Sequence, residues 1–112
     1  MNWQPLETIE QLNEIDALSK KRPVLIFKHS TRCNVSATAL DRLERKEGEL
    51  STEANYYLDL IAFRQISNEV AHRYQVVHES PQALIIRNGK AVHVTTHFEI
   101  NWDDLNRSAI EN

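Results

Sequence analysis

The feature that most constrains the fold is a short, continuous apolar run, Val24 to Phe27, between two segments with helical periodicity. A run without polar interruption is typical of a strand covered on both faces. Before it, residues 6–21 carry apolar side chains at helix-compatible spacing, and Pro23 disfavours helix in the residue ahead of it. After it, residues 32–46 are expected to form a helix that stops at Gly48. A buried strand between two helices predicts a layered α/β fold.

The rest of the chain continues this alternation. A strand, a helix and the two strands of a hairpin are expected at residues 55–60, 64–75, 82–87 and 90–96. Asn88-Gly89 predicts a two-residue hairpin turn, because both positions need positive φ. Asn101 is expected to cap a last helix with an acidic first turn. The predicted order is α-β-α-β-α-β-β-α, which gives a mixed four-stranded sheet with helices on both faces.

Length and charge exclude several kinds of protein. The 112 residues suffice for one core, so a single domain of residues 1–112 is expected. A net charge of −3, without a dominant basic patch, argues against binding of nucleic acid, and no apolar run approaches the length of a membrane span. The N-terminus lacks the pattern of a secretory signal, and one cysteine cannot form an internal disulfide. A cytoplasmic location is therefore expected.

The only cysteine, Cys33, stands where the buried strand gives way to a helix. Ser30 and Thr31 are both suitable N-caps, which would place Cys33 in the first turn beneath unpaired backbone N–H groups. Arg32 adds a neighbouring cation, and His29 adds another when protonated. These charges would stabilise a thiolate, and open α/β sheets place their sites at the carboxyl ends of central strands. The alternative is an inert, buried cysteine; the context favours a reactive one.

Two further positions belong to this candidate site. Ser36 occupies the place where a Cys-x-x-Cys redox protein carries its second cysteine, so Cys33 would work without a resolving partner. The hydroxyl of Ser36 would either donate to the thiolate or merely pack. Pro81 opens the first strand of the hairpin, at the end that the predicted topology brings near Cys33. The five histidines form no metal-spaced pair on one face, so no metal site is expected.

The order of an apolar strand, a cysteine at a helix start, a βαβ unit, Ser-Pro and an Asn-Gly hairpin resembles the thioredoxin superfamily. More narrowly, KHSTRCNVSATAL and YQVVHESPQALIIRNGKAVHVTTH resemble the monothiol bacilliredoxins of bacteria that use bacillithiol. The phrases KHST-x-C and HESPQAL carry most of the likeness, which runs over about residues 20–105. One departure is Asn34, where the familiar form of the family has proline after the cysteine. That change is expected to retune the reactivity of the thiol and the stiffness of its loop.

The resemblance implies a thioredoxin-like fold and a monothiol thiol–disulfide oxidoreductase. Cys33 would take a low-molecular-weight thiol, bacillithiol, from S-thiolated client proteins, and a second small thiol would release it. Thr31, Arg32 and the backbone of Ser80 would line the substrate groove. A cis peptide bond before Pro81 would bring its ring within van der Waals reach of the Cys33 sulfur. We expect no tightly bound cofactor, no nucleic-acid or membrane partner, and a monomer or weak dimer.

Two other classes of function stay open. An iron–sulfur carrier of the single-cysteine glutaredoxin type would be brown and dimeric, but those proteins carry Cys-Gly-Phe-Ser, which Asn34-Val35 does not match. A non-catalytic thioredoxin-like binding module would keep Cys33 buried and slow to react with thiol labels.

Overall fold

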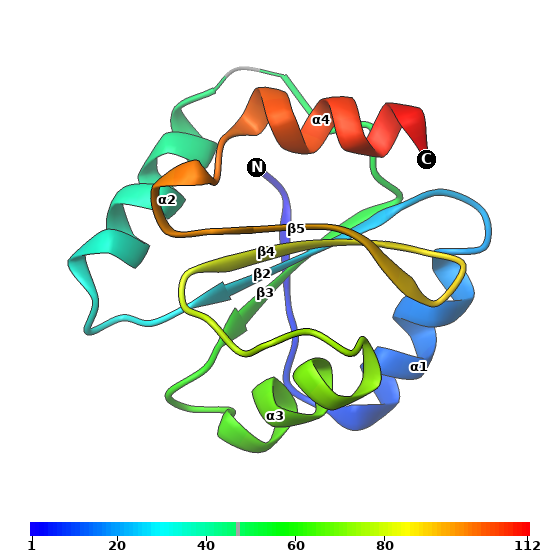
Figure 1. Cartoon of the computed structure of the whole chain (residues 1–112), viewed down its shortest axis with the longest axis horizontal. Coiled ribbons are helices and arrows are strands. Elements are labelled where there is room, and N and C mark those ends of the chain that lie inside the picture. Colours follow the sequence, from blue (N-terminus) through cyan, green and yellow to red (C-terminus); the bar gives the residue numbers. More distant parts are fainter. Residues whose placement is uncertain (47) are drawn as a thin grey trace.

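A mixed five-stranded sheet lies between two helical layers in the computed structural model, which describes residues 1–46 and 48–112 (Figure 1). The strands are β1 (Trp3–Pro5), β2 (Val24–His29), β3 (Ala54–Asp59), β4 (Gln82–Arg87) and β5 (Lys90–Thr96). The helices are α1 (Ile9–Leu18), α2 (Asn34–Arg45), α3 (Arg64–Arg73), a short 3₁₀ segment η1 (His97–Glu99) and α4 (Trp102–Glu111). The predicted mixed sheet with helices on both faces is confirmed.

The order of strands in the sheet is β1-β3-β2-β4-β5, which places β2 at its centre. β2 pairs in parallel with β3, whereas β4 runs antiparallel to both β2 and β5. All six residues of β2 are buried, as the apolar run predicted for a strand covered on both faces. The carboxyl end of this central strand is where Cys33 follows.

The predicted count of four strands is wrong, because β1 adds a fifth strand that the sequence pattern does not reveal. β1 is only three residues long, ends in proline and pairs in parallel with β3 at the edge of the sheet. A strand this short shows no alternating pattern, and its pairing depends on the distant residues of β3. Leu6 continues the pairing by donating its N–H to the carbonyl of Tyr57, at 2.8 Å.

The first helix is shorter than the predicted range of residues 6–21. It begins after Thr8, whose hydroxyl accepts from the N–H of Gln11 while the Gln11 side chain accepts from the backbone of Thr8. This capping box fixes the start of α1. Leu6 is fully buried, but as part of the strand-to-helix connection. Its apolar side chain extended the helical pattern in the sequence without belonging to the helix.

The core is divided by the sheet into two apolar clusters. One lies under α1 and α3 and includes Leu12, Ile26, Val70 and Leu84. The other lies under α2 and α4 and includes Phe27, Leu43, Ile85 and Leu105. Because side chains alternate along β2, Ile26 and Phe27 serve opposite clusters. The two faces therefore each bury a helical layer, as Figure 1 shows.

The predicted hairpin turn and the predicted cap of the last helix are both confirmed. Asn88 and Gly89 have φ values of 53° and 72°, as a type I′ turn requires. The side chain of Asn101 accepts from the N–H of Asp104 at 2.8 Å, which caps α4. The turn is also tied to α1, because the N–H of Gly89 donates to the hydroxyl of Ser19 at 2.9 Å.

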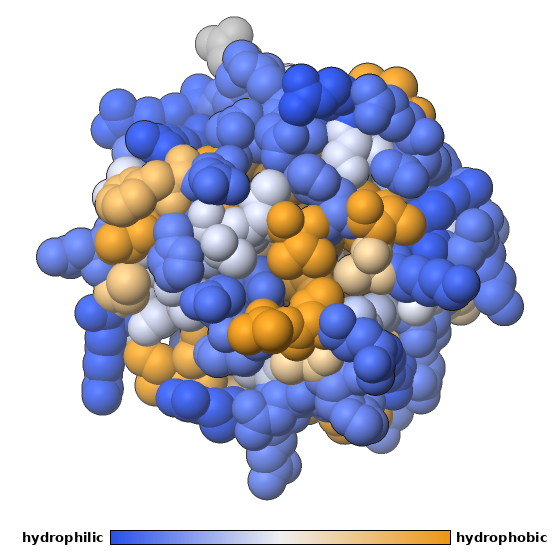
Figure 2. All heavy atoms as spheres, in the orientation of Figure 1, coloured by the Kyte–Doolittle hydropathy of each residue, from blue (hydrophilic) through white to orange (hydrophobic). Residues whose placement is uncertain are grey.

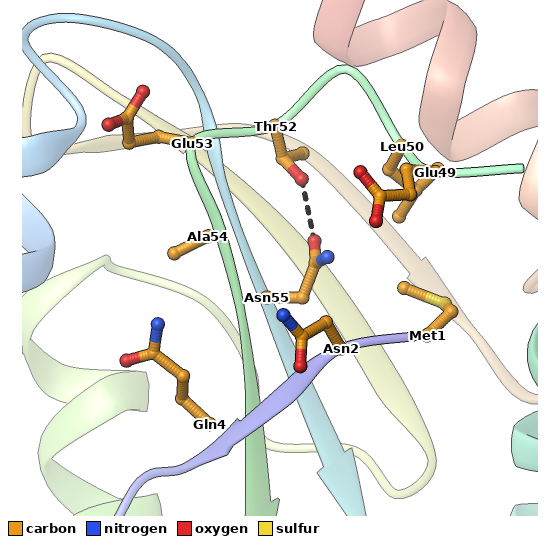
Figure 3. A pocket seen from close by; sticks show the side chains of 9 residues that line it. All are labelled: Met1, Asn2, Gln4, Glu49, Leu50, Thr52, Glu53, Ala54 and Asn55. Carbon is orange, nitrogen blue, oxygen red and sulfur yellow. Dashed lines mark hydrogen bonds between the residues drawn. The ribbon is translucent and has the colours of Figure 1, made fainter.

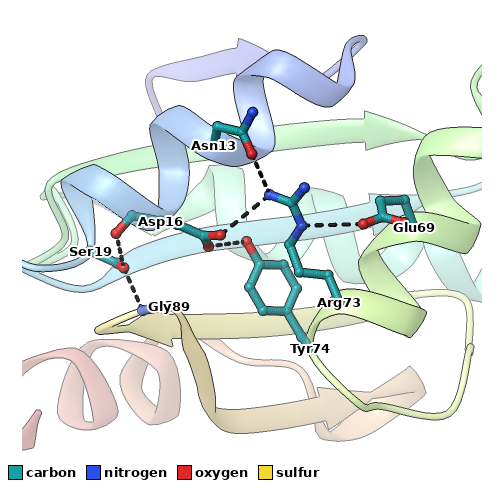
Figure 4. A network of polar contacts seen from close by, with 7 residues as sticks. All are labelled: Asn13, Asp16, Ser19, Glu69, Arg73, Tyr74 and Gly89. Carbon is teal, nitrogen blue, oxygen red and sulfur yellow. Dashed lines mark hydrogen bonds and ion pairs between the residues drawn. The ribbon is translucent and has the colours of Figure 1, made fainter.

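A polar network joins α1, α3 and this hairpin (Figure 4). Tyr74 donates its hydroxyl to Asp16 at 2.7 Å, and Arg73 lies 3.3 Å from the same carboxylate. Arg73 also pairs with Glu69 at 3.2 Å. Burial, followed by the hydrogen bond to Asp16, raises the pKa of Tyr74 above its ordinary value of 10.0. The network fixes the layer of α1 and α3 against the sheet.

Tyr74→Phe is expected to lower the free energy of unfolding by about 1–2 kcal/mol, because one hydrogen bond to a carboxylate is lost. Since the pKa of Tyr74 is raised on folding, the stability that it contributes is present below pH 10 and is lost as pH rises above it. Urea unfolding of both proteins at neutral and alkaline pH measures this. Tyr57→Phe, whose hydroxyl has no hydrogen-bond partner among the described residues, should change little; an equal loss in that control would contradict the assignment.

The surface is mainly hydrophilic. On the face shown in Figure 2, apolar residues gather near the middle, over the strands, with hydrophilic residues around them. The large apolar side chains that are exposed include Val92 and Val94 of β5, together with Ile9, Val77, Phe98 and Ile110. Among the described residues, no helix has the length and apolar character needed to cross a membrane.

Candidate functional site

The site is built by a tight turn between β2 and α2. β2 ends at His29, and the N–H of Cys33 donates to the carbonyl of Ser30 at 3.2 Å, closing a turn over residues 30–33. The N–H of Ser30 in turn donates to the hydroxyl of Ser36 at 3.0 Å. The turn is therefore fixed from both ends, and Cys33 has a defined place at the carboxyl end of the central strand.

Cys33 is itself the N-cap of α2, so the predicted N-cap at Ser30 or Thr31, with Cys33 in the first turn, is wrong. Cys33 has extended backbone angles (φ −114°, ψ 120°), and its carbonyl accepts the N–H of Ala37 at 3.0 Å. The turn over residues 30–33 uses Ser30 for its own closure, which moves the helix start to Asn34. Cys33 thus stands at the positive end of the helix dipole, although its side chain makes no capping hydrogen bond. The thiol is half-buried and free.

Ser36 and His29 form a buried pair behind the turn. Ser36 is fully buried and His29 is 5% exposed, and their Oγ and Nδ1 atoms lie 2.6 Å apart. The imidazole ring stacks on Phe27 and lies 5.4 Å from the ring of Tyr57. The hydroxyl of Ser36 is thus engaged by His29 and by the N–H of Ser30, which agrees with the packing alternative for this serine.

Burial lowers the pKa of His29 below its ordinary value of 6.5, although Asp59, the hydrogen bond with Ser36 and Glu44 act in the opposite direction. The ring is therefore mainly neutral at pH 7. The expectation that His29 supplies a second cation to the thiolate does not hold at neutral pH. A histidine in an apolar layer is desolvated, which the local sequence does not reveal.

Ser80 and Pro81 immediately precede β4, the strand that pairs with β2. The antiparallel register of β2 and β4 pairs Lys28 with Gln82, so Pro81 directly precedes the residue of β4 that pairs near the carboxyl end of β2. The peptide bond between Ser80 and Pro81 is cis, which confirms the prediction. Contact between the Pro81 ring and the Cys33 sulfur stays a prediction. The Ser80 hydroxyl is buried without a hydrogen-bond partner among the described residues.

The remaining predicted site residues stand on the surface of the turn. Thr31, Arg32 and Asn34 are all exposed and flank Cys33 directly. Arg32 donates only its backbone N–H within the turn, to the hydroxyl of Ser30 at 3.4 Å. The guanidinium group is thus available to an anionic group on a bound molecule. The site brings together a half-buried thiol, a helix N-terminus and an exposed cation at the carboxyl end of β2.

Sequence reasoning missed two contacts beside the site. Lys28, the residue before His29, is fully buried, and its Nζ lies 3.2 Å from Nδ1 of His78. A lysine inside an otherwise apolar strand was the signal that could have found it. On the other side, His97 donates its N–H to the carbonyl of Pro81 at 3.1 Å, and its ring lies 3.7 Å from the carboxylate of Glu79.

Cys33 does not line the pocket shown in Figure 3. It is lined by the N-terminal residues Met1 and Asn2, by β1, by the start of β3 and by the loop before β3, and a hydrogen bond of 2.6 Å joins Thr52 to Asn55 inside it. These are the amino ends of the parallel strands, whereas Cys33 follows a carboxyl end. In the part of the chain that the structure describes, no three His, Cys, Asp or Glu side chains are grouped as metal ligands.

Known proteins resemble this chain in sequence and in fold. Residues 4–105 match the family described as monothiol bacilliredoxin BrxC. A solved structure described as a provisionally assigned oxidoreductase with a thioredoxin fold is 31% identical, with 95% of this chain and 92% of that chain covered and a TM-score of 0.76.

Two thioredoxins share the fold at lower identity. The thioredoxin of Malassezia sympodialis is 15% identical, covering 98% of this chain and 90% of its own, with a TM-score of 0.72. The thioredoxin of Trypanosoma brucei brucei is 16% identical, covering 98% and 89%, with a TM-score of 0.74. At these identities the likeness concerns the fold alone.

Proposed function

Because the chain belongs to the monothiol bacilliredoxin family, a family of thiol oxidoreductases with a thioredoxin fold, we propose that it removes a low-molecular-weight thiol from mixed disulfides on proteins. The observation that carries the proposal is the placement of its only cysteine. Cys33 is half-buried at the N-terminus of α2, and the position one helical turn on holds a buried serine. Such a site can exchange thiols but cannot close a disulfide of its own.

The exchange takes place in two balanced steps. The Cys33 thiolate attacks the small-thiol sulfur of a protein–S–S–R mixed disulfide; that S–S bond breaks, the client leaves as a thiolate, and Cys33–S–S–R forms. A second small thiolate, RS⁻, then attacks the R sulfur, which frees the Cys33 thiolate and yields RSSR. The first step restores the client protein. The second needs an external thiol because Ser36 carries none.

The neighbouring groups have separate roles in this proposal. The helix N-terminus and the exposed Arg32 stabilise the anionic sulfur and receive anionic groups of the small thiol. The backbone of Ser80, beside Pro81, pairs with the peptide chain of the client as an added strand would. Thr31 and Asn34, both exposed and adjacent to Cys33 in the chain, border the groove in this proposal. Bacillithiol is the proposed co-substrate, S-thiolated cytoplasmic proteins are the proposed clients, and no tightly bound cofactor takes part.

The test is intact-mass measurement of the protein after incubation with an S-bacillithiolated client. The adduct is expected to move from the client to Cys33 and to stay there until free bacillithiol is added. The same client in S-glutathionylated form serves as the comparison, and it should transfer its adduct to Cys33 more slowly if bacillithiol is the natural thiol. A client that keeps its adduct would exclude the proposed reaction. A brown, dimeric preparation would instead favour the iron–sulfur carrier, and slow labelling of Cys33 would favour the binding module.

A further inference from the structure

Lys28 is a buried cation in the central strand. Its side chain is fully buried, and Nζ donates to the carbonyl of Ser67 in α3 at 3.0 Å and contacts Nδ1 of His78 at 3.2 Å. Burial alone lowers the pKa of Lys28 to about 8, with no described carboxylate to offset it. A buried ammonium without a counterion is costly to folding, and an apolar side chain of similar volume would serve the core better. Lys28 at this position therefore lowers the free energy of unfolding relative to an apolar side chain of similar volume.

The contacts of Lys28 lead to the segment that borders the proposed groove. His78 stands two residues before Ser80. The neighbouring residue Val77 is held in the same way, because Gln82 donates its amide N–H to the carbonyl of Val77 at 2.9 Å. Lys28 and Gln82 face each other across β2 and β4. Two adjacent side chains of the sheet therefore hold the two residues that lead into the Ser80–Pro81 bond.

His78 accepts this contact as a neutral ring. Burial, followed by the charges of Lys28 and Arg64, lowers its pKa, while Glu79 acts in the opposite direction. Nδ1 is thus free to accept from the ammonium, and the Ser67 hydroxyl lies 3.4 Å from the same atom. The other end of the segment is fixed by the bond from His97 to the carbonyl of Pro81. Not every hydrogen-bonding group around Lys28 and Gln82 is satisfied, since Oε1 of Gln82 is buried without a hydrogen-bond partner among the described residues.

We propose that Lys28 is a positioning residue that holds residues 77–80 through His78, so that the backbone of Ser80 is ready to pair with the peptide chain of a mixed-disulfide substrate. This inference rests on the proposed function and deepens it. The contact fixes the wall of the groove and does not reach the reacting sulfur. Its loss therefore weakens the binding of a peptide-linked substrate and leaves the intrinsic reactivity of Cys33 unchanged. It also relieves the buried charge, so binding and stability move in opposite directions.

The test uses Lys28→Met and His78→Leu, which remove the donor and the acceptor, with His78→Asn retaining an acceptor at the place of Nδ1. Release of bacillithiol from an S-bacillithiolated peptide gives KM and kcat, and iodoacetamide gives the alkylation rate of Cys33. We expect KM to rise about tenfold in the first two variants, because one charge-assisted hydrogen bond is lost, with kcat and alkylation within about twofold of wild type. His78→Asn is expected to keep KM near the wild-type value. The Tm of Lys28→Met should rise by about 5 °C.

The matched control is Lys90→Met, an exposed lysine of β5 at the far end of the sheet, which should leave KM and Tm unchanged. An unchanged KM in Lys28→Met and His78→Leu, with active wild-type protein, overturns the positioning role. A slower alkylation in step with a lower kcat overturns it too, because Lys28 then acts on the thiolate. His78 is exposed, so His78→Leu decides the matter even where Lys28→Met fails to fold. If the wild-type protein itself releases no small thiol from the substrate, the proposed function is wrong, which is a different outcome from loss of the positioning role.

Discussion

Cys33→Ala is expected to abolish transfer of the small thiol, with a loss of at least about a thousandfold in rate, because the only nucleophilic sulfur is gone. Stability should change by no more than about 1–2 kcal/mol, since only a small, half-buried side chain is removed. Intact mass after incubation with an S-bacillithiolated client measures the first effect, and urea unfolding measures the second. A variant that still releases the small thiol would show that Cys33 is structural.

Cys33→Ser sharpens the same experiment. Cys33 occupies the N-cap of α2 but makes no side-chain capping hydrogen bond, whereas serine is among the preferred N-cap residues. The serine variant is therefore expected to be inactive and yet more stable than wild type, by about 0.5–1 kcal/mol. That combination would separate the reactive role of the cysteine from any role in packing. A serine variant that is both inactive and strongly destabilised would instead place Cys33 among the structural residues.

Ser36→Cys is expected to change the chemistry from monothiol to dithiol. The new sulfur lies one helical turn from Cys33, so it can attack the mixed disulfide, release the small thiol and close an internal disulfide. Wild-type protein should hold the adduct until free thiol is added, because a serine hydroxyl is not ionised at neutral pH. Intact mass shows the difference directly. The adduct persists in wild type, whereas the variant releases RSH spontaneously and ends two hydrogens lighter than its reduced form.

The hydrogen bonds of Ser36 determine how much stability the Ser36→Cys change loses, and they also indicate a suitable control variant. Cysteine is a weak acceptor, so the bond from the N–H of Ser30 and the contact with His29 are both weakened, at a cost of about 1–3 kcal/mol. Ser36→Ala loses the same bonds without gaining a thiol, and it should keep the adduct as wild type does. If Ser36→Ala also sheds the adduct, loosening of the turn explains the release and the dithiol interpretation fails. A Ser36→Cys protein that retains its adduct would show that the buried position cannot resolve it.

Local patterns in the sequence were sufficient for most of the fold. The continuous apolar run of β2 predicted a strand covered on both faces, and Asn88-Gly89 and Asn101 predicted their turn and cap, because each of these depends on neighbouring residues only. The strand β1 could not be predicted in this way. Three residues ending in proline carry no periodicity, and their pairing partner is more than fifty residues away in β3.

For the site, the sequence by itself identified Cys33 as the residue on which the proposed exchange depends, since a single cysteine with a serine three positions on has no resolving thiol within the chain. Tertiary structure decided the surroundings of that sulfur. The turn closed by Ser30 moved the helix start to Asn34, burial kept His29 neutral, and the approach of α3 and β4 enclosed Lys28 beside His78. Desolvation and long-range contacts set charge states, and neither can be read from the order of residues along the chain.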